Sequence, residues 1–182
     1  MIKAVAVAAA AAFTLPLLII VLVTASPAPP AASLPGTPAA LAGAGIPPSG
    51  GRAARQVAAT AIAFAEAQLG KPYQWGAAGP DAYDCSGLVY AAYAAAGIRL
   101  GRTTYQWQQD GPVVPLSQIQ PGDLLFSAGS DGTPANPGHV VMYLGDGQVI
   151  QAPQTGQDVQ TDPLDLASVV VATRPAALAT EP

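Results

Sequence analysis

Charge is almost absent from the first 51 residues of this chain, where Lys3 is the single charged side chain. The apolar run 4–23 follows Lys3 directly, which is the pattern of a secretory signal with a basic start and an apolar centre. About 20 apolar residues also suffice for a helix that crosses a bilayer. We therefore expect residues 1–25 to be a cleaved signal peptide or an uncleaved membrane anchor. Either one exports the rest of the chain, which is then secreted, located in the cell wall, or anchored to the outer face of the cytoplasmic membrane.

Residues 26–51 are rich in Pro, Ala, Gly and Ser and carry no charge. Such a stretch has too few large apolar side chains to bury a core, so we expect a flexible linker. The remaining sequence predicts one folded domain over residues 52–176 and a disordered tail over residues 177–182.

The overall charge argues against a nucleic-acid partner, and the counts of Cys and His argue against a disulfide and a zinc site. The net charge is -4, the pI is near 4.6, and the seven basic residues are scattered singly along the chain. A nucleic-acid partner is not expected, because no basic stripe could contact phosphates. One Cys and one His form neither an intrachain disulfide nor a Cys/His zinc site. We expect a monomer without metal or cofactor.

Two helices are predicted in the first half of the domain. Apolar residues recur at helical spacing over 55–69, and Gly70 and Pro72 follow where that helix should end. A second helix is predicted over 85–96, with Asp84 as its N-cap.

Strand patterns dominate the second half, where a Pro-Gly turn at 121–122 precedes them. Short β segments are predicted at 123–127, 139–144, 148–152 and 169–173. Helices followed by strands favour an α+β domain with an antiparallel sheet.

Cys85 stands at the predicted start of the second helix. The first N–H groups of a helix have no partner within it, and the helix dipole is positive at that end. Both effects favour a thiolate, so we expect the pKa of Cys85 to fall below its usual value. Gly87 leaves room for a substrate carbonyl beside the backbone. The alternative is that Cys85 is a small buried apolar residue.

His139 begins a predicted strand, and a hairpin gives it a neighbour. If residues 145–147 form a three-residue loop, Leu144 faces Gln148 and Gln151 lies diagonal to His139 on the same face. The amide oxygen of Gln151 could then accept Nδ1–H of His139 and turn Nε2 toward the thiol. A two-residue loop would place Gln151 on the opposite face. Without that partner, His139 and Gln151 are ordinary polar residues.

Several motifs resemble, in order, those of the NlpC/P60 cysteine peptidases, and the resemblance covers roughly residues 57–174. The matching pieces are Pro72-Tyr73-Gln74-Trp75-Gly76, Gly79-Pro80, Tyr83-Asp84-Cys85-Ser86-Gly87-Leu88-Val89, Pro121-Gly122-Asp123-Leu124, Gly138-His139-Val140, Tyr143-Leu144-Gly145 and Val149-Ile150-Gln151-Ala152-Pro153.

The resemblance implies a papain-like α+β fold, with N-terminal helices packed on a central antiparallel sheet. It implies hydrolysis of peptidoglycan stem peptides, typically between γ-D-glutamyl and diaminopimelyl or lysyl residues. Cys85 matches the nucleophile, His139 the base and Gln151 the third polar residue, which is more often His in the family.

Further residues are candidates for binding or support. By resemblance, Tyr73 assists at the oxyanion, and Asp84 and Ser86 hold the free amine of a stem peptide. Arg102 and Trp107 could line the cleft, Arg102 as the partner of a carboxylate. Burial of Trp107 in the core is the alternative, and Asp84 also serves as a plain N-cap.

Two other functions use the same fold. One is a cell-wall-binding module without catalysis, and the other is an amidase or acyltransferase that uses the same Cys and His. The presence of both Cys85 and His139 favours the peptidase.

Overall fold

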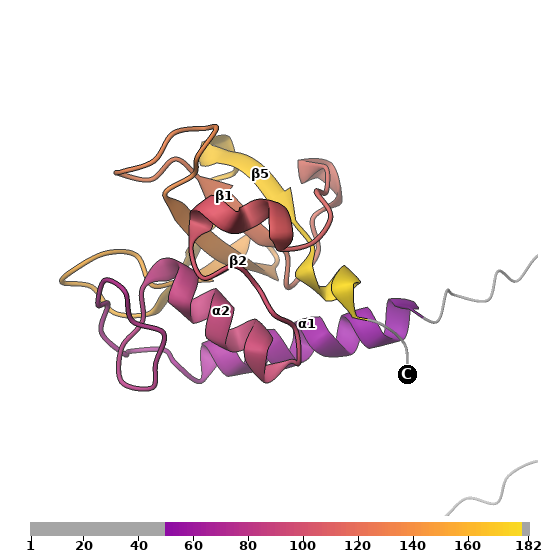
Figure 1. Ribbon diagram of the computed structural model, residues 1–182, viewed down its shortest axis with the longest axis horizontal. Helices are drawn as coiled ribbons and strands as arrows, with labels where there is room; N and C mark the ends of the chain where they lie inside the picture. Colours follow the sequence, from indigo (N-terminus) through magenta and orange to yellow (C-terminus); the bar gives the residue numbers. More distant parts are fainter. Residues whose placement is uncertain (1–49, 180–182) are drawn as a thin grey trace, which may run out of the picture. The chain divides into compact units, whose positions relative to one another are not determined.

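The computed structural model describes residues 50–179, which fold into two helices, a five-stranded sheet and four short 3-10 helices (Figure 1). The helices are α1 (Gly50–Glu66) and α2 (Cys85–Ala95). The strands are β1 (Leu124–Ser127), β2 (His139–Gly145), β3 (Gln148–Gln151), β4 (Gln160–Pro163) and β5 (Val169–Thr173). The 3-10 helices are η1 (Thr104–Gln109), η2 (Leu116–Gln118), η3 (Leu166–Ser168) and η4 (Pro175–Leu178).

The strands pair antiparallel throughout, in the spatial order β4-β3-β2-β1-β5. The two long helices precede all five strands in the sequence. The predicted α+β class with an antiparallel sheet is therefore confirmed.

The two faces of the sheet have different covers. Val140 and Met142 of β2 are buried in the main core, together with Leu88 and Ala92 of α2. Figure 1 shows α1 and α2 side by side along this face. Alternate residues of β2 point the other way, where Val141 joins a smaller cluster. The strand alternation thus separates the helix-covered face from the face that carries His139, Val141 and Tyr143.

The first helix is longer at its start than predicted and shorter at its end. It begins at Gly50 rather than 55, and it ends at Glu66 rather than Leu69. After Glu66 the chain turns, and Gly70 has φ +80 with its N–H bonded to the carbonyl of Val159. The N–H groups of Gln68 and Leu69 bond to carbonyls three residues back, so the chain leaves the α-helix before its apolar pattern ends. The linker expected over 26–51 includes the first two residues of this helix.

The strand β4 was not predicted. Its sequence, Gln-Thr-Asp-Pro, has no apolar alternation and ends in Pro163. It lies at the edge of the sheet, where it pairs only with β3. Edge strands tolerate Pro and need no continuous apolar face, so the sequence pattern carries no signal for it.

The hairpin between β2 and β3 differs from the predicted three-residue loop. Gly145 pairs with Gln148, so the loop contains Asp146 and Gly147 alone. Tyr143 nevertheless pairs with Val149, because Leu144 is an extra residue that shifts the register as a bulge. The loop length was wrong, but the register of the strand body agrees with the prediction. Gln151 therefore keeps the face of His139.

The predicted signal or anchor (residues 1–25) and most of the linker (residues 26–49) lie outside the described residues. Within 50–179, neither helix combines the length and the apolar character needed to cross a membrane. The expected tail starts inside η4, where Ala176 is buried, and residues 180–182 are outside the described part.

Candidate active site

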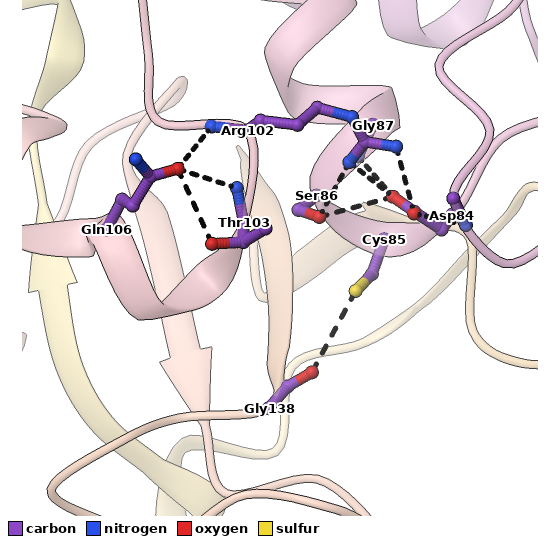
Figure 2. Close-up of polar contacts among 9 residues, drawn as sticks. Asp84, Cys85, Ser86, Gly87, Arg102, Thr103, Gln106 and Gly138 are labelled. Carbon is purple, nitrogen blue, oxygen red and sulfur yellow. Dashed lines mark hydrogen bonds and ion pairs between the residues drawn. The ribbon is translucent and has the colours of Figure 1, made fainter.

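Cys85 is the first residue of α2, as predicted, and Asp84 is the N-cap. The side chain of Asp84 accepts a hydrogen bond from the N–H of Gly87 at 2.5 Å. Cys85 is 8% exposed, and its Sγ lies 4.0 Å from the carbonyl oxygen of Gly138, the residue before β2. The helix start thus carries the thiol to the beginning of the strand that holds His139 (Figure 2).

Gly87 serves packing and not substrate access. A Cβ at this position would lie 2.0 Å from the carbonyl oxygen of Ala77. The space that we expected for a substrate carbonyl is therefore filled by the loop before α2. Only glycine fits here, because the loop backbone lies against the helix.

Asp84, Ser86 and Arg102 form one polar network beside the thiol (Figure 2). The guanidinium of Arg102 donates to both oxygens of Asp84, at 3.1 and 3.0 Å, and to Oγ of Ser86 at 3.1 Å. Asp84 also accepts from the N–H groups of Gly76 and Gly87. Arg102 was expected to bind a substrate carboxylate, but its charge is paired with Asp84 within the chain. The network leaves Asp84 little capacity for a substrate amine.

His139 and Gln151 meet as the register requires. Nε2 of His139 lies 2.6 Å from Oε1 of Gln151. We had expected Nδ1 to face the glutamine, so the two ring nitrogens are exchanged relative to the prediction. Nδ1 is then the ring nitrogen left for the thiol of Cys85. The amide nitrogen of Gln151 donates onward to Asp162 of β4, at 2.7 Å.

Two adjoining pockets share Cys85. The first, of about 300 Å³, is lined by Cys85 and the Asp84–Ser86–Arg102 network. The second, of about 370 Å³, is lined by Cys85, His139 and Tyr73. We call the second one the histidine pocket. The nucleophile and base candidates therefore border the same space, although the thiol itself contacts Gly138.

Burial shifts the pKa values of both groups toward their neutral forms. It raises the pKa of the Cys85 thiol, and Asp84 and Asp131 raise it further, against backbone hydrogen bonds from Val140 and Ser86. Burial also lowers the pKa of His139, against the hydrogen bond to Gln151 and the charge of Asp131. The expected lowering of the Cys85 pKa was wrong, because the loss of water outweighs the favourable helix start. Both shifts favour the thiol and the neutral imidazole over the ion pair.

Tyr73 borders the histidine pocket with both groups. Burial, with the charges of Cys85, Asp84 and Asp131, raises the pKa of its phenol above 10.0. The hydroxyl therefore keeps its proton near neutral pH, and it can donate a hydrogen bond.

Trp107 is not part of either pocket. Its ring packs on Phe126, with centroids 6.4 Å apart, so it belongs to the core cluster. The pockets instead contain Trp75, which is 73% exposed, and Asp131, which borders both. Trp75 lies in a motif that the sequence singled out. Asp131 lies in a loop without periodicity, so no sequence signal marked it.

No cluster of three or more His, Cys, Asp or Glu side chains suited to a metal ion occurs among residues 50–179. Beside Cys85, the side chains of Asp84, Ser86 and Arg102 bond to one another.

Comparison with known proteins places this site in a family. The family model described as NlpC/P60 matches residues 70–172. The murein DD-endopeptidase MepH of Escherichia coli (strain K12) is 41% identical over 97 residues, which are 51% of this chain and 35% of MepH. The peptidoglycan endopeptidase RipA of Mycolicibacterium smegmatis is 37% identical over 110 residues, which are 53% of this chain and 21% of RipA. The chain thus spans about a third or less of these relatives.

Solved structures agree with the sequence comparison. A structure of the resuscitation promoting factor interacting protein RipA, mutated at C383, superposes with a TM-score of 0.60 at 32% identity. The superposed region covers 66% of this chain and 63% of the RipA chain. The peptidoglycan hydrolase RipB of Mycobacterium tuberculosis superposes with a TM-score of 0.59 at 32% identity, covering 71% of each chain.

Proposed function

The chain belongs to the NlpC/P60 family, and from that premise we propose that it is an exported cysteine endopeptidase of peptidoglycan stem peptides. The observation that carries the proposal is the histidine pocket, in which Cys85 and His139 border one space. The names of MepH and RipA, which are endopeptidases of murein or peptidoglycan, support the substrate class.

In the proposed mechanism, Nδ1 of His139 removes the proton from the Cys85 thiol as Sγ attacks the scissile carbonyl carbon. The C–N bond then breaks, and the leaving amine takes that proton from Nδ1. A water molecule attacks the resulting thioester while Nδ1 accepts its proton. The acid product leaves, and the proton returns to Sγ. Gln151 holds the ring through Nε2 during these steps.

The negative oxygen of the tetrahedral intermediate needs donors close to Sγ. The backbone N–H of Cys85 at the start of α2 is one candidate. The Tyr73 hydroxyl is the second, since it borders the same pocket and its raised pKa keeps it protonated. The helix dipole of α2 adds a favourable field at the same point.

The finer substrate is also a proposal. We propose the bond between γ-D-glutamyl and a diaminopimelyl or lysyl residue. Resemblance assigned Asp84 and Ser86 to a free amine on the substrate, but Arg102 neutralises Asp84. We therefore expect this wall of the first pocket to hold uncharged polar groups of the peptide, with Trp75 and Tyr105 offering exposed rings.

The proposal extends to the rest of the chain. Residues 1–25 act as the export signal or anchor, residues 26–49 tether the domain, and the folded domain of residues 50–179 carries the catalysis. The apolar run after Lys3 and the uncharged linker support this division.

Substitution Cys85→Ala tests the peptidase directly. Removing the nucleophile leaves no group to form the thioester, so cleavage of purified muropeptides should fall at least roughly a thousandfold. Mass spectrometry of the products measures the rate and also identifies the bond that is cut. Val170→Ala, at an exposed position of the edge strand β5, is the control and should cleave at the wild-type rate. Full-rate cleavage by folded Cys85→Ala would refute the mechanism.

A further inference from the structure

Gln151 lies between His139 and a carboxylate that the mechanism has not used. Its Oε1 is 2.6 Å from Nε2 of His139, and its Nε2 donates to Oδ2 of Asp162 at 2.7 Å. Gln160 donates to the same oxygen of Asp162 at 2.8 Å. Three side chains from β2, β3 and β4 thus form a continuous chain of hydrogen bonds across neighbouring strands.

The strand register accounts for this arrangement. Gln151 pairs with Gln160, and Val149 pairs with Asp162. Paired residues share a face of the sheet, and so do residues two apart on one strand. Asp162 is therefore the diagonal neighbour of Gln151, just as Gln151 is the diagonal neighbour of His139.

A carboxylate can only accept hydrogen bonds, so the amide NH2 of Gln151 must face Asp162. The amide oxygen then faces His139, which requires the proton of the neutral ring to be on Nε2. Nδ1 consequently carries the lone pair that the thiol proton needs. We propose that Asp162 is a positioning residue that sets the tautomer of His139 through Gln151; the catalytic meaning of this tautomer rests on the proposed function.

The reverse arrangement shows what Asp162 prevents. An amide group has nearly the same shape after a half-turn about its last torsion, so sterics alone do not fix its orientation. A turned Gln151 would present NH2 to Nε2 of His139. The ring proton would then move to Nδ1, and a protonated Nδ1 cannot accept the proton of Cys85. Asp162 disfavours this state, because it would meet the amide oxygen with its own negative oxygen.

The tautomer can be measured without any substrate. The chain contains one histidine, so nitrogen NMR of the imidazole in the untagged protein reports His139 alone. We expect the wild type to hold the proton on Nε2. Asp162→Ala should give a mixture of both tautomers, and Asp162→Asn, which keeps an oxygen acceptor of similar size, should restore most of the Nε2–H form. An unchanged tautomer in folded Asp162→Ala would overturn the proposal.

Thr161→Ala is the matched control. Thr161 is the exposed neighbour of Asp162 on the same edge strand. It pairs with Ile150, so it alternates to the other side of the strand from Asp162. Truncating it tests whether any change in β4 disturbs His139. The control should leave the tautomer and the activity as in the wild type, and a tautomer change equal to that of Asp162→Ala would show a general effect of the strand instead.

Kinetics test whether Asp162 acts through Gln151. Asp162→Ala should lower kcat roughly tenfold with little change in KM, because the base and not the substrate contacts is affected. In a Gln151→Ala background the same substitution should cause no further loss. Independent, multiplying losses would overturn the proposed route. If the wild type cleaves no stem peptide while the tautomer still depends on Asp162, the proposed function fails and the positioning role stands.

Discussion

The thiol of Cys85 and the imidazole of His139 lose most of their contact with water, and burial acts on the two groups in opposite directions. It raises the pKa of the thiol and lowers that of the imidazole. Both shifts favour the uncharged pair, so the thiolate forms as the proton moves to His139 during attack. The charge of Asp131 raises both pKa values. It opposes burial at His139 and adds to it at Cys85.

The acid limb of the pH–rate profile should follow His139. Its neutral form is the active base, and its pKa lies below 6.5 in the folded protein. We expect kcat/KM for a substrate without titrating groups to rise with pH through a midpoint below 6.5. A midpoint above 7 would contradict the burial argument. Asp131→Asn, which removes a charge that raises the His139 pKa, should move the midpoint to lower pH.

Single residues could be nominated from the sequence where a local pattern marks them. The N-cap, Asp84, and the helix start identify Cys85 without any knowledge of its neighbours. Asp131 and Asp162 carry no such mark, because each gains its role from residues distant in the chain. Trp107 was a candidate for the cleft, but it packs on Phe126 in the core. This contact is also set by tertiary packing and has no local pattern in the sequence.

In the hairpin between β2 and β3, a bulge cancels the error in the predicted loop length. Leu144 was expected to pair with Gln148, whereas Gly145 does so and Leu144 becomes a bulge. A bulge and a two-residue loop together contain as many residues as the predicted arrangement. The face of Gln151 depends on the total and not on the loop type, so the side-chain pairing with His139 survives.

An ion pair with a buried carboxylate joins the ends of two paired strands. Asp123 directly precedes β1, Arg174 directly follows β5, and their side chains bond at 2.8 and 2.9 Å. Asp123 is 1% exposed. Arg174 also donates to the carbonyl of Gln118, which fastens the end of η2.

Arg174→Met should therefore destabilise the domain. It leaves the Asp123 carboxylate buried without its cation, which costs about 2–4 kcal/mol when the partial exposure of Arg174 is taken into account. Urea unfolding measures the free energy change. Adding Asp123→Asn to Arg174→Met should recover part of the loss, since no buried charge then remains. Arg99 is exposed, so Arg99→Met is the matched control. An equally small loss of stability from both substitutions would contradict the role of the Asp123–Arg174 ion pair.

At the scale of the whole molecule, the chain divides between a folded part and a segment with almost no charge. The family model matches residues 70–172, within the described domain. The segment before residue 50 lies outside the described residues, so its role rests on the sequence: one Lys, an apolar run and an uncharged linker.

The proposed export can be tested by the N-terminal residue of the protein and by the cell fraction that contains it. If residues 1–25 are a cleaved signal, N-terminal sequencing of the exported protein should begin near Ser26, and the protein should be found in the medium or the wall. If they are an anchor, the intact chain should be found in the membrane fraction, and protease added outside the cell should cut the linker and release the domain. Retention of the intact chain in the cytoplasm would contradict both forms of the proposal.

The sequence by itself determined the helix start at Cys85, four of the five strands and the register between β2 and β3. These features depend on caps, alternation and turns, which act over a few neighbouring residues. Only the tertiary structure decided which ring nitrogen of His139 faces Gln151, the direction of the Cys85 pKa shift, the pairing of Arg102 with Asp84, and the place of Asp162. Each of these depends on burial or on contacts between distant segments, because desolvation and hydrogen-bond partners are set by packing and not by local pattern.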